Sequence, residues 1–127
     1  MSIISKQSEK FLEKYLNTTS PSGFEIEGQK TWLNYLEPFI DQWDLDNYGT
    51  AYGIINPGCE YSVVIEGHAD EISWFVNYIS DEGFINVIRN GGSDHIIAPS
   101  KRVSIHTKKG IVEGVFGWPA IHTRIGK

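Results

Sequence analysis

The stretch Tyr61-Ser62-Val63-Val64-Ile65-Glu66-Gly67-His68-Ala69-Asp70-Glu71-Ile72 decides the fold of this 127-residue chain. Its first part is a near-continuous apolar run, which is the pattern of a buried central strand. His68 follows at the carboxyl end of that strand, where open α/β sheets collect ligands and metals. Asp70, two residues later, can orient the imidazole or contact a metal site from behind it. The stretch therefore predicts an α/β fold with a histidine at the edge of its sheet.

Two amphipathic helices are predicted before this strand. Residues 5–17 place apolar side chains on one side and charged ones on the other, and a polar, proline-containing loop follows. Ser22 and Glu25 have the spacing of a capping box, so a second helix is expected to start at Gly23 and to end near Pro38. We expect both helices to cover one face of the sheet.

Strands make up the rest of the pattern. It predicts strands at residues 42–46 and 51–55, and after Asp70 two hairpins, formed by residues 72–79 with 84–88 and by residues 102–107 with 111–116. Gly114 and Gly117 suggest bends or bulges of the kind that small curved barrels need. Helices therefore give way to strands alone at the corner formed by His68 and Asp70, which is a candidate domain boundary.

Composition restricts the class of protein. The formal net charge is −5, and no basic cluster exceeds the pairs Lys101-Arg102 and Lys108-Lys109, which argues against nucleic-acid binding. No apolar run reaches the length of a membrane span, and the first residues do not form a secretory signal. Cys59 is the only cysteine, which excludes a disulfide framework and a thiolate zinc cluster. We expect a cytoplasmic protein without nucleic-acid or membrane partners.

Four motifs occur in the order in which one enzyme family has them. They are Pro21-Ser22-Gly23-Phe24-Glu25, Asp46-Asn47-Tyr48-Gly49-Thr50, Gly67-His68-Ala69-Asp70-Glu71-Ile72, and the stretch from Arg102 to Gly117 with Pro119 and His122. Each is weak alone, but together they span nearly the whole chain. The chain resembles the dinuclear metallo-aminopeptidases called glutamyl or deblocking aminopeptidases, some of which are described as endoglucanases. Thr50 and Ser73 depart from the family pattern, which has asparagine and glycine there.

The resemblance implies one metal ligand and one supporting carboxylate. His68 would bind one of two divalent ions, zinc or cobalt, and Asp70 would be the catalytic residue that supports it. The family's bridging aspartate, its glutamate pair with the general base, and its remaining ligands lie beyond position 127. A lone histidine holds zinc weakly, because protein zinc sites use three or four ligands. The chain by itself is therefore expected to be inactive as a peptidase.

The resemblance also implies a division into domains. Residues 1–70 would be the N-terminal part of an αβα-sandwich catalytic domain. Residues 71–127 would begin an inserted antiparallel β-barrel domain, which in the family forms a lid over the pocket and assembles the subunits. A peptide substrate and a homo-oligomer are therefore expected.

The leading hypothesis for function is a metal-dependent aminopeptidase that removes N-terminal residues from peptides. The alternative is a non-catalytic α/β interaction module, because no catalytic base stands in a convincing setting. A glycoside hydrolase is a third hypothesis, but it needs two acids flanking a sugar, and no such pair stands out. The sequence assigns no substrate-binding residue, and one imidazole suits zinc, cobalt and manganese equally.

Other polar residues have more ordinary interpretations. Glu71 is expected to be structural or to face the substrate. Asp94 and His95 follow a glycine-rich loop, so adjacency alone does not predict a catalytic dyad. His106 is predicted at the surface of a strand, and His122 matches a family histidine to which we assign no role.

Overall fold

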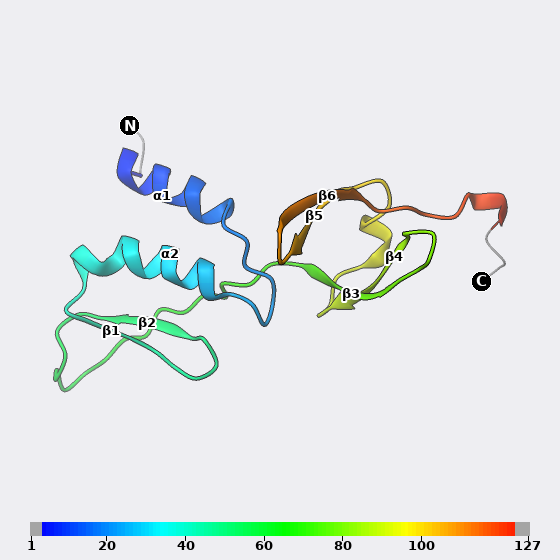
Figure 1. Cartoon of the computed structure of the whole chain (residues 1–127). Coiled ribbons are helices and arrows are strands. Elements are labelled where there is room, and N and C mark those ends of the chain that lie inside the picture. Colours follow the sequence, from blue (N-terminus) through cyan, green and yellow to red (C-terminus); the bar gives the residue numbers. More distant parts are fainter. Residues whose placement is uncertain (1–3, 124–127) are drawn as a thin grey trace.

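The computed structural model describes residues 4–123 and arranges them in two lobes (Figure 1). The first lobe holds two helices and a hairpin: α1 (Lys6–Leu16), α2 (Ile26–Leu36), β1 (Gln42–Leu45) and β2 (Ala51–Ile54). The second holds two hairpins: β3 (Ser73–Ile79) with β4 (Ile85–Asn90), and β5 (Arg102–Thr107) with β6 (Gly110–Val115). Short 3₁₀ turns lie at Glu37–Phe39, His95–Ile97 and Ile121–Thr123. The predicted mixed α/β class is confirmed, and the described strands form three separate two-stranded sheets rather than a closed barrel.

The first helix forms where its pattern predicts. Ser5 is the N-cap residue, and its hydroxyl accepts a hydrogen bond from the Ser8 N–H at 3.0 Å. The ring of Phe11 stacks on Tyr35 of α2, with centroids 3.9 Å apart and an interplanar angle of 12°. In Figure 1, α2 lies between α1 and the β1–β2 hairpin, so the two helices are layered rather than side by side on one sheet face.

The predicted start of the second helix at Gly23 is wrong. The helix begins at Ile26, and the motif before it forms a β-turn, closed by a hydrogen bond of 2.8 Å from the Phe24 N–H to the Pro21 carbonyl. Gly23 sits at the third position of this turn with φ of +83°, which glycine adopts without strain. The turn points Ser22 away from the helix end, so its hydroxyl is not the cap that the sequence spacing suggested.

A tight turn joins β1 to β2, which form where strands are predicted at residues 42–46 and 51–55. One oxygen of Asp46 accepts hydrogen bonds from the N–H groups of Tyr48 and Thr50, at 2.8 and 2.9 Å. Gly49 follows with φ of +85°. The bond from the Thr50 N–H is the main reason why the pKa of Asp46 lies below its ordinary value, since it favours the charged form. The Asp46 carboxylate thus accepts hydrogen bonds from two backbone N–H groups of the turn.

The predicted central strand at Tyr61–Ile65 is not formed. This segment has no strand partner among residues 4–123, and the side chains of Val64 and Ile65 are 83% and 96% exposed. The only described sheet of the first lobe is the pair β1–β2, and neither of its strands pairs with the apolar run. An apolar run makes a strand only where a neighbouring strand satisfies its backbone.

The hairpins of the second lobe confirm the predicted pairing. Bends or bulges are predicted at Gly114 and Gly117, and the strand pairing shows no bulge at Gly114. The register of β5 and β6 runs unbroken from Arg102↔Val115 to Thr107↔Gly110. The irregularity lies instead in β3, between Val76 and Tyr78. At position 114 a Cβ would lie 2.9 Å from Cδ1 of Ile105, so a larger residue there would displace the end of that side chain.

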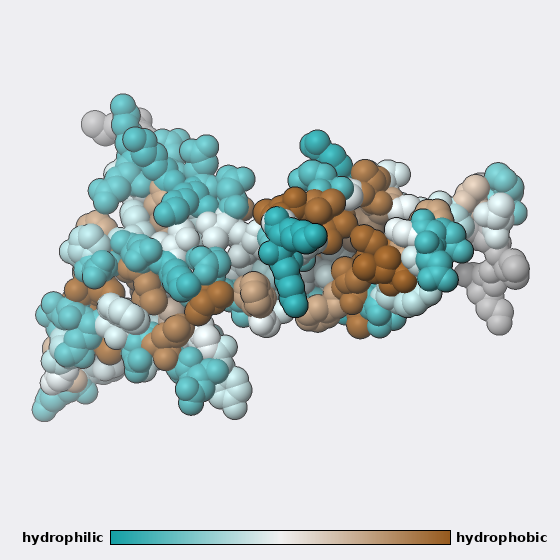
Figure 2. Space-filling model, viewed as in Figure 1, coloured by the Kyte–Doolittle hydropathy of each residue, from teal (hydrophilic) through white to brown (hydrophobic). Residues whose placement is uncertain are grey.

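Little apolar surface is buried within the described residues. Ala98 is the one buried hydrophobic side chain among them, beside the buried Ser20, Thr31 and Ser93. Figure 2 shows apolar residues gathered over the second lobe, where Ile111, Val112, Val115, Phe75 and Ile88 are all more than half exposed. In residues 4–123 no helix has the length and hydropathy to cross a membrane.

Candidate functional site

His68 and Asp70 form a hydrogen-bonded pair. Nδ1 of His68 lies 2.8 Å from Oδ1 of Asp70 and 3.1 Å from the Asp70 carbonyl oxygen. Both neighbours are acceptors, so Nδ1 carries the proton and the lone pair of a neutral ring sits on Nε2. The imidazole is 86% exposed, which leaves Nε2 accessible. The pair therefore has the form in which a carboxylate orients a metal-binding histidine.

The second oxygen of Asp70 is held by the N-terminal turn. The Ser22 hydroxyl donates a hydrogen bond to Oδ2 of Asp70, across 48 positions of sequence. The bonds from Ser22 and then from His68 lower the pKa of Asp70 from its ordinary value, because both favour the carboxylate. Asp70 is thus an anion with a different donor on each oxygen.

The same turn is fastened to the next residue of the motif. The Ser20 N–H donates to a carboxylate oxygen of Glu71 at 2.9 Å, and the Glu71 N–H donates to the Ser20 carbonyl at 2.8 Å. Pro21 and Glu71 also form a parallel β-bridge. Glu71 therefore holds the turn in place, which is the structural role among the two roles expected for it.

A residue of the second lobe completes the cluster. The amide nitrogen of Asn90, the last residue of β4, donates to the Ser22 carbonyl at 2.6 Å and to the Ser73 hydroxyl at 2.8 Å. Ser22 is therefore held through its carbonyl by one lobe while its hydroxyl holds Asp70. Sequence reasoning did not find Asn90, which lies 68 positions from Ser22 and belongs to no motif.

A hollow of about 200 Å³ lies beside the pair. It is lined by Glu25 and Gln29 near the start of α2, by residues 48–50 of the β1–β2 turn, and by residues 67–70. The Gln29 side chain joins two of these segments, since it donates to the Gly49 carbonyl at 3.0 Å. Three stretches that stood out separately in the sequence therefore meet at one place.

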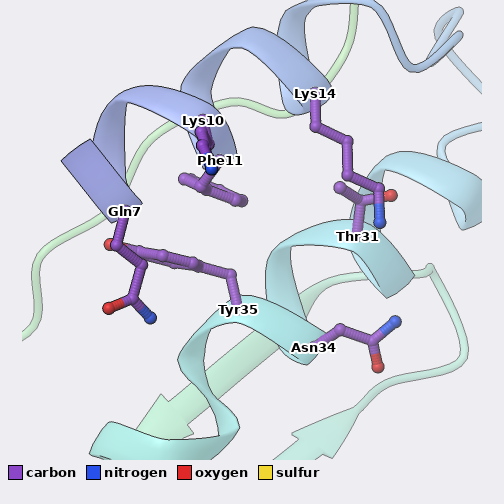
Figure 3. A pocket seen from close by; sticks show the side chains of 7 residues that line it. All are labelled: Gln7, Lys10, Phe11, Lys14, Thr31, Asn34 and Tyr35. Carbon is purple, nitrogen blue, oxygen red and sulfur yellow. The ribbon is translucent and has the colours of Figure 1, made fainter.

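A larger hollow, of about 270 Å³, lies between α1 and α2 and contains none of the predicted site residues. Figure 3 shows the rings of Phe11 and Tyr35 between the two helices, with Lys10 and Lys14 on α1 and Asn34 on α2. It is a groove between packed helices. We place the candidate site at the smaller hollow, because His68 and Asp70 line it.

The remaining candidate residues do not join the pair. Asp94 caps the turn at His95–Ile97 by accepting from the Ile96 N–H at 2.9 Å, and His95 lies 6.1 Å, centroid to centroid, from the ring of Trp118. His106 and His122 are exposed on other elements. Within residues 4–123, no three His, Cys, Asp or Glu side chains are grouped as a metal ion would require. His68 fits one position of a metal site, and the described residues do not supply the rest.

Comparison with known proteins identifies the family. The family model described as M42 glutamyl aminopeptidase matches residues 50–127, and the chain belongs to this family. FrvX of Escherichia coli (strain K12), whose name assigns it to the aminopeptidases, is 32% identical over 113 residues, covering 87% of this chain and 31% of its own length.

Solved structures give the same result. The TET aminopeptidase of the marine sediment archaeon Thaumarchaeota archaeon SCGC AB-539-E09 superposes with a TM-score of 0.87 at 28% identity, over 94% of this chain and 33% of its own. TET1 peptidase of Pyrococcus horikoshii can assemble into a tetrahedron or a large octahedral shell. It superposes with a TM-score of 0.67 at 25% identity, over 94% of this chain and 36% of its own. The chain thus spans about a third of the length of the relatives it matches.

Proposed function

We propose that this chain is the N-terminal part of a metal-dependent aminopeptidase in which His68 is a metal ligand and Asp70 orients it. The observation that carries the proposal is the geometry of the pair. Nδ1 of His68 faces only acceptors, so its proton is fixed there and Nε2 is left to bind a cation. Membership of the M42 family supports the choice of a peptidase over other metal-dependent hydrolases.

The cofactor that we propose is a pair of divalent ions, zinc or cobalt. Such ions, when bound, polarise the scissile carbonyl and activate a water. His68 would hold one of them through Nε2, and Asp70 would keep the ring oriented by accepting a hydrogen bond from the Nδ1–H group. The other ligands and the general base would come from the part of the protein that the relatives have and this chain does not span. The substrate is proposed to be a peptide with a free amino terminus.

The two lobes support a proposed division into domains. Residues 1–70 would be part of an αβα sandwich, in which the exposed apolar segment Tyr61–Ile65 becomes a sheet strand once its neighbours are present. Residues 71–127 would begin an inserted β-barrel domain, built from the two hairpins of the second lobe.

We further propose that the whole protein is a cytoplasmic homo-oligomer. Two observations support the oligomer: the assembly of the TET1 relative, and the exposed apolar side chains of the second lobe, which are the kind of surface that subunit interfaces cover. Light scattering of the whole protein at micromolar concentration tests this, and a monomer contradicts it.

The proposed function is tested with the full-length protein and its His68→Ala variant. We expect the parent to bind divalent metal and to release N-terminal residues from peptides, and the variant to lose most of both. His106→Ala, which removes an exposed histidine of β5, is the matched control and should behave like the parent. Absence of divalent metal from the parent, or full activity of His68→Ala, would overturn the proposal and favour a non-catalytic interaction module.

The chain of residues 1–127 gives a second test. Calorimetric titration with zinc should show binding no tighter than that of a peptide with one accessible histidine, because one ligand is a small part of a three- or four-ligand site. Tight binding that disappears in His68→Ala would show that these residues build a fuller site than the described part of the chain contains.

A further inference from the structure

We propose that Ser22 is a positioning residue for the His68 metal ligand, which it acts on through Asp70. This inference rests on the proposed function for its meaning, but its geometry is independent of that function. The Ser22 hydroxyl donates to Oδ2 of Asp70, and Oδ1 of the same carboxylate accepts from Nδ1 of His68. Two hydrogen bonds thus connect Ser22 through Asp70 to His68, whose Nε2 atom is left accessible.

The two hydrogen bonds fix the orientation of the Asp70 carboxylate. Asp70 is only partly buried, and a partly exposed carboxylate with one partner can rotate to place either oxygen toward water. With Ser22 on one oxygen and His68 on the other, rotation breaks two hydrogen bonds at once. Hydrogen bonds to a charged acceptor are also stronger than those between neutral groups. Ser22 therefore favours the one orientation that holds the Nδ1 proton of His68.

Ser22 can do this because its own backbone is fixed from two sides. The turn that contains it is closed by the bond from the Phe24 N–H to the Pro21 carbonyl, and Asn90 binds the Ser22 carbonyl at 2.6 Å. Asn90 belongs to the second lobe, whereas Ser22 belongs to the first. The position of the β3–β4 hairpin is thus connected to the orientation of the proposed ligand by three successive hydrogen bonds.

The test reads the tautomer of His68 directly, without metal. Long-range ¹H–¹⁵N spectra of residues 1–127 at neutral pH distinguish a ring protonated on Nδ1 from one protonated on Nε2, and the His68→Ala spectrum identifies the signals. We expect the parent to show the Nδ1–H form of His68. In Ser22→Ala, the ratio of Nδ1–H to Nε2–H should fall by about fivefold, the effect of losing one ordinary hydrogen bond.

Three further variants make the outcome specific. Ser22→Thr retains a hydroxyl and should keep the parent ratio, whereas Asn90→Ala should lower it part of the way. Ser80→Ala removes a hydroxyl that binds the Phe84 N–H in the β3–β4 turn, and it should leave the ratio unchanged. If Ser22→Ala does not fold, the Ser22→Thr and Asn90→Ala ratios decide the question.

An unchanged His68 ratio in folded Ser22→Ala would overturn this inference, as would a ratio in Ser22→Thr as low as that expected for alanine. Neither result depends on peptidase activity. Failure of the proposed function is a separate result: the full-length parent would contain no divalent metal, whichever tautomer His68 adopts.

Discussion

Replacing Gly28 by alanine should destabilise the chain by forcing α2 away from the loop that leads to Ser22. Gly28 is buried in α2 and faces the buried Ser20. A Cβ at position 28 would lie 2.5 Å from Oγ and 3.0 Å from Cβ of Ser20. Both separations are shorter than van der Waals contact. Ser20 cannot retreat freely, because its N–H and carbonyl are both hydrogen-bonded to Glu71.

Two opposing effects set the size of the change. Alanine is a better helix former than glycine, which contributes roughly 1 kcal/mol in favour of the variant. Overpacking a closely fitted contact costs about 1–3 kcal/mol. Since contact with the Ser20 Cβ persists even if the hydroxyl rotates away, we expect overpacking to win. The free energy of unfolding of Gly28→Ala should fall by about 1 kcal/mol.

Urea unfolding followed by tryptophan fluorescence measures this change, because Trp32 lies on α2 itself. A second substitution, Ser20→Ala, removes the nearer of the two contacting atoms. The Ser20 hydroxyl finds no hydrogen-bond partner within residues 4–123, so its loss alone should be nearly neutral. In a double-mutant cycle, Ser20→Ala should therefore recover a large part of the stability that Gly28→Ala loses.

Gly92→Ala is the matched control, because a Cβ at position 92 would meet nothing within 4 Å. Its stability should stay close to that of the parent. If Gly28→Ala proved as stable as the parent or more so, the close approach of α2 to Ser20 would be refuted. A cycle with no coupling between positions 20 and 28 would refute it equally.

Three further outcomes follow from the first lobe. The folded pKa of Asp46 lies below its ordinary value, so its stabilising effect is present above the unfolded pKa and is lost as pH falls through the folded pKa. Asp46→Asn should therefore be less stable than the parent at neutral pH and approach it in acid, and a constant difference in urea midpoint across that range would contradict this. Tyr35→Phe should cost about 0.5–1 kcal/mol, because it loses the 2.9 Å hydrogen bond to Ser8 but keeps the ring stack on Phe11; Tyr35→Ala should cost more, and equal losses in thermal unfolding would show that the stack contributes nothing. Ile65→Thr should change the stability of residues 1–127 by less than about 0.5 kcal/mol, since the side chain is 96% exposed. In the full-length protein the same change should cost about 1–3 kcal/mol if the segment becomes a buried strand, and equal effects in both would argue against that strand.

Local sequence determined the elements whose hydrogen bonds join residues close together in the sequence. The helix at Lys6–Leu16 and the three hairpins form where periodicity and turn residues predict them, because their partners lie only a few residues apart. His68 and Asp70 lie within reach of each other for the same reason, since they are only two positions apart at a chain corner. The sequence could therefore predict that pair without a model of the fold.

Tertiary structure alone decided what holds the pair and what the apolar run does. Ser22 fits a helix cap by its spacing, yet its turn directs the hydroxyl to Asp70, and Asn90 reaches Ser22 across 68 positions of sequence. Spacing along a chain carries no information on such distant partners. The segment Tyr61–Ile65 illustrates the same limit, because its composition predicts a strand but a strand also needs a neighbour to satisfy its backbone. Pattern specifies what a segment can form, and the packed fold decides whether its partners are within reach.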